Sequence, residues 1–325
     1  MIDIDQIKKP IKTELEQFEQ EWKNIFVSEN PILIQVYRYV LGMNGKQIRP
    51  ALTFLSAKLC GEITKTTILS ALIVELLHTV SLLHDDVVDE ALLRRGKSSV
   101  NKLWGNKVAI LAGDHLLSKG VSLIGRIDQK EIIDDFSEIG KALSEGELLQ
   151  LSSSNRLIFD EQEYFEIISK KTAILFARCM KIGAVSTKNA QEKDIENLRQ
   201  FGENLGICFQ IRDDIFDYFS NKEVGKPTAN DIRDKKITLP LLYAYSAASE
   251  SEQKDIKQML QSDELSDEAI QFLISFAKEK GGIEYAEKRM FEYREKAMQS
   301  LQSFDNEDIK KSLIGVLDYS VLRKK

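Results

Sequence analysis

The sequence DDVVD at residues 85–89 closes a long apolar stretch, and the same spacing returns as DDIFD at residues 213–217. Residues four apart share one face of a helix, so the first and last aspartates of each copy point the same way. Three like charges on one helical turn repel each other, and hard divalent cations bound through oxygen offset that repulsion. A single acidic triplet on a helix is usually a solvated surface. Two copies in apolar surroundings instead predict two carboxylate clusters that face each other and hold Mg²⁺ against a phosphate-rich ligand.

The chain around these motifs has the pattern of long helices. It contains only five prolines in 325 residues, and none lies between Pro50 and Pro227. Apolar residues recur at i, i+3 and i+4, whereas alternating strand patterns are hard to find. We therefore expect an all-α fold in one domain over residues 1–325, with a loop at 221–236. The expected helices span residues 5–28, 31–41, 47–60, 66–90, 106–125, 131–152, 161–185, 191–219, 238–248, 251–262, 267–280, 283–303 and 307–322.

Composition narrows the class of protein. Hydrophobic residues make up 43% and charged residues 30%, which fits a globular protein with a sizeable core. The net charge of −6 gives no sign of nucleic-acid binding. The three cysteines form no CxxC pair, so neither a disulfide framework nor a zinc site is expected. We expect the protein to lie in a reducing cytoplasm.

The ends of the chain show no pattern of a targeting signal. The N-terminal residues lack the basic and apolar regions of a signal peptide, and no stretch approaches the roughly 18 consecutive apolar residues of a membrane span. The C-terminal residues Arg323, Lys324 and Lys325 are expected to form a solvated tail. A transient membrane contact during product release is left open for them.

The position of the acidic motifs argues for function. Both close long helices, where the partial negative charge of a helix C-terminus disfavours carboxylates. An unfavourable arrangement used twice indicates a site rather than a solubility device. His78 lies two turns before Asp85 on the same face. At this point His78 is either a core histidine whose ring is hydrogen-bonded within the protein or a histidine that binds a ligand.

Basic residues near these motifs could bind phosphate oxygens that the metals do not reach. Lys46 and Arg49 lie at a glycine turn that enters a helix, where backbone N–H groups also favour an anion. Arg94 and Arg95 follow the first motif, and the planar arginine fork can donate two hydrogen bonds to one phosphate. Further candidates lie on a helix, beside the second motif or around the loop after it: Lys171, Thr172, Gln210, Lys226 and Lys236. Taken singly, each is more often a surface residue.

The ordered set of motifs resembles the trans-isoprenyl diphosphate synthases of the polyprenyl synthetase family, and most closely the bacterial octaprenyl type. The matching segments run over most of the chain: Gly45-Lys46-x-x-Arg49-Pro50, His78, residues 83–89 with Arg94-Arg95-Gly96, Gly113-Asp114, Glu145-Gly146-Glu147-x-x-Gln150, Lys171-Thr172, Phe209-Gln210-x-x-Asp213-Asp214-x-x-Asp217, Lys226, Asp231 and Lys236. The chain departs from the pattern at Ala229 and Asn230, where a glycine-containing loop is common, and at Lys235, where glycine often precedes the lysine.

The resemblance implies an isoprenoid synthase fold, a helical bundle around a deep central cavity, and a homodimer. It also implies roles for individual residues, which are expectations at this point. Three Mg²⁺ ions would be held by Asp85, Asp89 and Asp213, supported by Asp86, Asp214 and Asp217. The allylic diphosphate would contact Arg94, Lys171, Thr172, Gln210, Lys226 and Lys236, and isopentenyl diphosphate would contact Lys46, Arg49, His78 and Arg95.

The implied reaction fits this inventory of residues. A C–O bond to diphosphate breaks and leaves an allylic cation, which the double bond of isopentenyl diphosphate then attacks. Mg²⁺ and cationic side chains stabilise the charge on the leaving group. No nucleophilic residue is needed, and the departing diphosphate can take the final proton.

Product length is expected to depend on the helix that leads to Asp85. One turn rises about 5.4 Å, close to one extended five-carbon unit. Val80 and Ser81 lie one turn before the motif, with Leu77 one turn deeper. Short-chain members of the family carry bulky aromatics at these two positions, so the small residues in this chain predict a product of about C30 to C45, with C40 as the best single value, for a quinone side chain.

Other functions stay open at this point. A C20 geranylgeranyl diphosphate synthase would keep the enzyme class but shorten the product. A class I terpene cyclase would normally carry a second motif with Asn, Ser or Thr and Glu. An inactive regulatory subunit would normally have lost one aspartate motif, and both motifs are intact in this chain.

Overall fold

A computed structural model describes residues 4–43, 45–219, 229–262 and 264–323. The chain falls into two compact units. The first contains Met1–Gly140, Arg178–Arg199 and Ser303–Val316, and the second contains Lys141–Ala177, Gln200–Gln302 and Leu317–Lys325. The expectation of a single domain over residues 1–325 stays a prediction.

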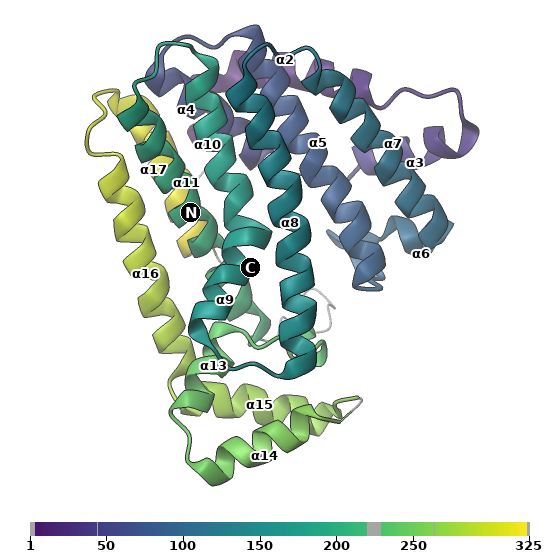
Figure 1. Cartoon of the computed structure of the whole chain (residues 1–325), viewed down its shortest axis with the longest axis vertical. Coiled ribbons are helices and arrows are strands. Elements are labelled where there is room, and N and C mark those ends of the chain that lie inside the picture. Colours follow the sequence, from purple (N-terminus) through teal and green to yellow (C-terminus); the bar gives the residue numbers. More distant parts are fainter. Residues whose placement is uncertain (1–3, 44, 220–228, 263, 324–325) are drawn as a thin grey trace. The chain divides into compact units, whose positions relative to one another are not determined.

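Helices make up nearly all of the regular structure in the described residues (Figure 1). The first ten α-helices are α1 (Ile4–Lys8), α2 (Lys12–Ile25), α3 (Pro31–Leu41), α4 (Ile48–Cys60), α5 (Lys65–Val88), α6 (Val100–Trp104), α7 (Asn106–Ile124), α8 (Lys130–Arg156), α9 (Glu161–Ile168) and α10 (Ile174–Ser186). The others are α11 (Glu192–Asp217), α12 (Asn230–Arg233), α13 (Leu239–Ser246), α14 (Glu250–Leu260), α15 (Asp267–Glu279), α16 (Gly282–Ser300) and α17 (Glu307–Leu322). Short elements complete the chain: the 3₁₀-helix η1 (Lys9–Ile11), the π-helix η2 (Ser169–Ala173), and strands β1 (Leu93–Arg94) and β2 (Lys97–Ser98). The predicted all-α class is confirmed.

Helix α5 is the core of the first unit and carries the first acidic motif at its end. Thr64 caps its N-terminus in a reciprocal pair with Thr67. The helix packs most extensively against α7 and also against α4. A Cβ atom at Gly113 of α7 would lie only 2.4 Å from His84 Nε2, so glycine permits the close approach of the two helices.

The apolar composition of α5 has a second consequence. Among the described residues it is the one helix long and apolar enough to cross a membrane, judged by length and composition alone. However, 56% of its most apolar window is buried inside the structure. The core helix of a globular protein passes the same test.

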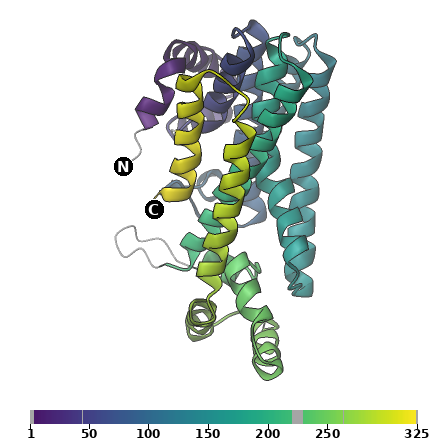
Figure 2. The same cartoon turned by 90° about the vertical axis from the view of Figure 1, so that its left-hand side faces the viewer.

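In the second unit, helices α13 to α16 pack together around α13 (Figures 1 and 2). The rings of Tyr243 on α13 and Tyr285 on α16 stack with centroids 4.1 Å apart. Ser249 and Glu252 form a capping box at the start of α14, and Ser266 caps α15. These caps explain why the sequence predicted both helix starts to within one residue.

The structure corrects the predicted elements at a few points. Strands β1 and β2, helix α6 and helix α12 were not predicted. The hairpin turn uses Arg95 and Gly96 at φ 51° and 76°, and two positive φ angles fit the twist of a tight hairpin. The helix predicted at 5–28 is interrupted by η1 at Pro10, and the one predicted at 161–185 contains η2. Much of the predicted loop, residues 220–228, lies outside the described residues.

Candidate active site

The first acidic motif lies at the C-terminal end of α5, and its three carboxylates have different surroundings. Asp85 is half-buried, and Asp89, which caps the helix, is exposed. The middle residue, Asp86, is only 3% exposed. The outer two aspartates are therefore more accessible than the middle one, and their assignment as metal ligands stays a prediction.

Asp86 holds the hairpin that follows the motif. Arg94 Nε donates to Asp86 Oδ1 at 2.8 Å, and Arg94 Nη2 forms an ion pair with the same oxygen. Asn101 Nδ2 donates to the backbone oxygen of Asp86 at 2.9 Å. Burial raises the pKa of Asp86, and Arg94 opposes the rise. Asp86 thus supports the motif by fixing Arg94 and the chain after it.

Two basic segments that are distant in the sequence meet beside this motif. Arg95 Nη1 donates to the backbone oxygen of Met43 at 2.6 Å, and Lys97 Nζ donates to that of Gly42 at 2.9 Å. A Cβ atom at Gly45 would lie 2.7 Å from Arg95 Nη1, so glycine at this turn leaves room for the guanidinium of Arg95. Lys46 is exposed on this turn. The structure therefore joins two parts of the predicted isopentenyl diphosphate site.

The charge of Arg49 acts on His78, another predicted residue of the isopentenyl diphosphate site. Burial is the main influence on the pKa of His78, and Arg49, Arg95 and Arg94 add to it, so the pKa lies well below its usual range. His78 is therefore neutral near pH 7. The buried Glu75 has a raised pKa because of burial, which Arg49 and Arg95 partly offset. The positive charge in this region comes from arginines, which suits a diphosphate.

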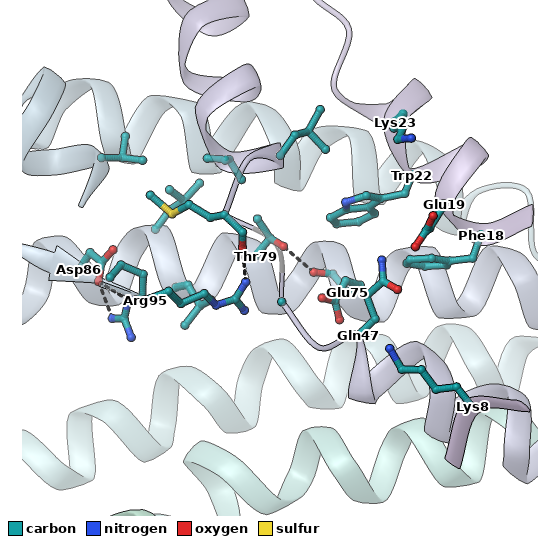
Figure 3. A pocket seen from close by; sticks show the side chains of 18 residues that line it. Lys8, Phe18, Glu19, Trp22, Lys23, Gln47, Glu75, Thr79, Asp86 and Arg95 are labelled. Atoms are coloured by element: carbon teal, nitrogen blue, oxygen red, sulfur yellow. Dashed lines mark hydrogen bonds and ion pairs between the residues drawn. The ribbon is translucent and has the colours of Figure 1, made fainter. Parts of the chain in front are cut away.

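A cavity of about 510 Å³ adjoins these groups in the first unit (Figure 3). Phe18 and Trp22 of α2 line one side, and Glu75 and Thr79 of α5 lie across from them, with Arg95 nearby. The full lining is Lys8, Phe18, Glu19, Trp22, Lys23, Val40, Leu41, Met43, Gly45, Gln47, Glu75, Thr79, Leu82, Leu83, Asp86, Arg94, Arg95 and Val100. Its volume is within the range typical of ligand pockets.

The middle aspartate of the second motif is also buried, but its partners are neutral. Asp214, 3% exposed, accepts from Tyr164 Oη at 2.6 Å and from Gln210 Nε2 at 2.7 Å. Thr172 Oγ1 donates to Gln210 Oε1 at 2.7 Å. Burial, with Asp231 as the next contribution, raises the pKa of Asp214 to about 8. The predicted ligand contacts Gln210 and Thr172 thus form a network that holds Asp214.

The last aspartate of the second motif caps a helix that the sequence did not predict. Asp217 accepts from the backbone N–H of Asn230 at 3.1 Å and of Asp231 at 2.9 Å, at the start of α12. Burial and then Asp217 raise the pKa of Asp231 to about 6. Ala229 and Lys235, two of the departures from the family pattern, have positive φ angles of 64° and 55°. Glycine adopts such angles more easily than a residue with a Cβ atom.

Two lysines of the second unit, Lys171 and Lys236, pair with carboxylates and line a cavity beside the second motif. Lys171 lies in η2, where a wider helical turn changes the direction of the side chains, and it pairs with Glu147 and Gln150. Lys236 Nζ lies 3.0 Å from Asp234 Oδ2. A cavity of about 110 Å³ brings both lysines together with Tyr164, Thr172, Gln210, Asp214 and Asp231. Lys226 lies outside the described residues.

The C-terminus does not form the solvated tail that we expected at Arg323. Its guanidinium pairs with Asp213, the first aspartate of the second motif, and lies over the ring of Phe209 at 4.3 Å. Arg323 and Tyr164 are thus two partners of the motif that sequence reasoning missed. The clustering of basic residues at the end of the chain was a signal for the first, but nothing local marked the second.

The residues proposed to control product length lie along α5. Val80 is buried, whereas Leu77 and Ser81 are half-buried. Val80 lies one turn from His84, which contacts α7, so Val80 faces the same side. Ser81 lies one turn before Asp85, on the side of the first motif.

No preformed metal site is evident in the described part of the chain. Within residues 4–43, 45–219, 229–262 and 264–323, no three His, Cys, Asp or Glu side chains converge to hold an ion. Asp85 with Asp89, and Asp213, still offer the oxygen ligands that Mg²⁺ prefers. In each unit, carboxylates of this kind fit an ion whose remaining ligands are water and diphosphate oxygens.

Comparisons with known proteins identify the family and the fold of the chain. The family model described as polyprenyl synthetase matches residues 30–276. The chain is 31% identical to octaprenyl diphosphate synthase of Haemophilus influenzae over 99% of this chain and 98% of that protein. A crystal structure of a polyprenyl synthase from Caulobacter crescentus, complexed with calcium and isoprenyl diphosphate, matches with a TM-score of 0.93 and 29% identity, over 99% and 98% of the two chains.

A further solved structure is more similar in sequence. Geranylgeranyl pyrophosphate synthase from Bacteroides thetaiotaomicron is 39% identical, with a TM-score of 0.85, over 98% of this chain and 99% of that one. The predicted isoprenoid synthase fold is thereby confirmed. The chain belongs to the polyprenyl synthetase family and is a trans-prenyltransferase.

Proposed function

We propose that the protein condenses isopentenyl diphosphate with an allylic diphosphate, farnesyl or geranylgeranyl, to give an all-trans polyprenyl diphosphate. Family membership implies both classes of substrate. The observation that carries the proposal is the end of α5. The half-buried Asp85 and the exposed Asp89 lie there, and Asp86 between them pairs with Arg94.

The residues of this chain have separate tasks in the reaction. Mg²⁺, three ions in our proposal, would be held by Asp85, Asp89 and Asp213, and when bound it stabilises negative charge on the departing diphosphate. Arg94, Lys171, Thr172, Gln210, Lys226 and Lys236 would orient the allylic diphosphate. Lys46, Arg49, His78 and Arg95 would bind isopentenyl diphosphate and position its double bond. Asp86, Asp214 and Asp217 would support these groups through their hydrogen bonds and ion pairs.

For product length we propose about C30 to C45, with C40 as the central value, by the one-turn spacing along α5. Small side chains at Val80 and Ser81 support this range, with Leu77 as the next turn. The 39% identity to a geranylgeranyl pyrophosphate synthase favours C20 as the second candidate. The Val80→Tyr variant separates length control at this turn from control elsewhere: products should shorten, and unchanged products would place the control at other residues.

We propose a homodimer in the cytoplasm. Leu111 and Val121 on α7 are 66% and 60% exposed, and Ile110 on the same helix is also exposed. Exposed apolar side chains of this kind suit a second copy of the chain. Sedimentation at several protein concentrations, with Leu111→Glu as the variant, tests the assembly. A monomeric wild-type protein would contradict it.

The function is tested by a product assay. Purified protein is incubated with Mg²⁺, farnesyl diphosphate and labelled isopentenyl diphosphate, and the dephosphorylated products are sized by chromatography. Products of C30 to C45 support the proposal, and a stop at C20 would favour the second candidate. Absence of elongation by a folded protein would contradict the proposal and would favour the hypothesis of an inactive regulatory subunit.

A further inference from the structure

The C-terminal Arg323 contacts the carboxylate that we propose as a metal ligand. Its Nη2 pairs with Asp213 Oδ1 and lies 3.5 Å from the backbone oxygen of Phe209. The guanidinium carbon lies 4.3 Å from the ring centre of Phe209 and 5.5 Å from that of Phe216. The side chain is thus fixed by charge, by hydrogen bonding and by stacking on α11.

The backbone of Arg323 is held as firmly as its side chain. Its N–H donates to the oxygen of Tyr319 at 3.1 Å, which continues the hydrogen-bond pattern of α17. Its own oxygen accepts from Arg212 Nη2 at 3.1 Å, and Arg212 in turn lies over Phe216 at 4.6 Å. The end of α17 is therefore docked on the part of α11 that carries the second motif.

This arrangement matters because of where the two charges lie. The side chain of Asp213 is 43% exposed, so solvent ions can reach it, whereas that of Arg323 is only 17% exposed. A divalent cation at Asp213 would share its carboxylate with a guanidinium that is already bound there. Two cations at one carboxylate repel each other, so the metal must displace Arg323 or bind more weakly.

We propose that Arg323 is an internal counter-ion of Asp213 that lowers metal affinity until diphosphate is present. The inference rests on the proposed function, because it takes Asp213 as a metal ligand. Diphosphate adds negative charge at the site, which relieves the repulsion between the metal and the guanidinium. Arg323 would then be a positioning residue that couples metal binding to substrate binding.

The test measures binding of Mn²⁺ by electron paramagnetic resonance in the full-length chain. An Asp85→Asn, Asp89→Asn background removes the proposed ligands of the first motif, so that the signal reports the second. Without diphosphate, Arg323→Gln should bind Mn²⁺ about tenfold more tightly than its parent. With pyrophosphate added, the difference should shrink to about twofold or less.

Two variants serve as controls. Arg323→Lys keeps the positive charge and should bind Mn²⁺ much as the parent does. Arg294→Gln removes a different ion pair of α17, in which Arg294 Nε lies 3.0 Å from Asp318 Oδ1, and should leave Mn²⁺ affinity unchanged. If Arg323→Gln does not fold, Arg323→Met retains the stacking on Phe209 and takes its place.

The outcomes separate this inference from the proposed function. If Asp213→Asn does not weaken Mn²⁺ binding, then the assignment of Asp213 as a metal ligand fails. If Asp213→Asn weakens binding but neutral variants of Arg323 bind Mn²⁺ no more tightly than the parent, only the counter-ion inference is overturned. Arg323 would then merely anchor the end of α17.

Discussion

The two acidic motifs have the same spacing but are supported in different ways. In the first, the buried middle residue Asp86 pairs with a cation, Arg94, from the following hairpin. In the second, the buried Asp214 accepts hydrogen bonds from the neutral groups of Tyr164 and Gln210. Burial raises the pKa of both carboxyls, but only Asp86 has an arginine beside it to limit the rise.

The difference shows that repeated sequence does not mean repeated electrostatics. An ionised Asp86 stabilises Arg94 in its position next to Arg95, where positive charge suits a diphosphate. With its pKa raised to about 8, Asp214 adds less negative charge beside Asp213 near pH 7 than an ordinary aspartate would. The two motifs should therefore respond alike to changes at their first aspartates and differently to changes at their middle ones.

The largest expected effect concerns the first aspartates. Asp85→Ala and Asp213→Ala should each reduce the rate of prenyl transfer by about a thousandfold or more, because charge on the leaving group loses its stabilisation. Steady-state kinetics with farnesyl and isopentenyl diphosphates measures this. Asp134→Ala, an exposed aspartate of α8, is the matched control and should leave the rate unchanged. Near-normal rates in either motif variant would contradict the metal assignment.

Substitution of the middle aspartates should separate the motifs. Asp86→Asn leaves Arg94 without its ionised partner and should lower the free energy of unfolding by about 1–3 kcal/mol. Asp214→Asn keeps an acceptor for Tyr164 or Gln210 and should change it by about 1 kcal/mol or less. Urea unfolding in EDTA provides both values. Equal losses would show that the two carboxyls have the same charge state.

The pH dependence of stability should reveal the protonated Asp214. Its pKa of about 8 in the folded protein exceeds the usual value of about 3.9 for an unfolded chain. The folded state therefore binds this proton more tightly, and the stabilisation is fully present below about pH 4 and lost as the pH rises through about 8. In EDTA, Asp214→Asn should reduce the fall in unfolding free energy between pH 5.5 and 8.5 (a range of about three units around that pKa). An identical pH profile for variant and wild type would contradict the raised pKa.

Removal of single donors should give smaller losses. Tyr164→Phe deletes one neutral hydrogen bond to Asp214 and should cost about 1 kcal/mol of unfolding free energy. Arg94→Leu deletes a charge-assisted bond to Asp86 and should cost roughly twice as much. Thermal unfolding of both variants in EDTA provides the ratio. A larger loss for Tyr164→Phe would mean that Asp214 is ionised in the folded protein.

The smallest effect concerns α12, whose first backbone N–H groups donate to Asp217 of the second motif. Ala229 precedes this helix with a φ angle of 64°, where a Cβ atom is unfavourable. Ala229→Gly should stabilise the protein by up to about 1 kcal/mol, since the relief of strain exceeds the added freedom of the unfolded chain. Ala247→Gly, at φ −86°, is the control and should destabilise. Destabilisation by both would contradict strain at Ala229.

Sequence alone predicted elements whose signals are local. Helix α3 was predicted with its observed ends because Pro31 follows Asn30, whose side chain caps the helix. The hairpin escaped prediction because its strands have two residues each and no alternating pattern. The acidic and basic motifs were predicted to form the site from their types and spacing, and that assignment stays a prediction. Tyr164 lies 50 residues before Asp214, and Arg323 lies 110 residues after Asp213, so local sequence does not record which aspartate either residue contacts.

The π-helix η2 determines how Tyr164, which lies near the second motif, is rotated about the helix axis relative to α10. It lies between α9, which carries Tyr164, and α10, and its wide turn holds one residue more than an α-helical turn would. Each residue of an α-helix advances the chain by about 100°. A one-residue deletion at Ser169 would restore an unbroken α-helix, but it would rotate Tyr164 by about 100° relative to α10 and away from Asp214. A regular α-helix at this point would thus remove the hydrogen bond from Tyr164 to Asp214.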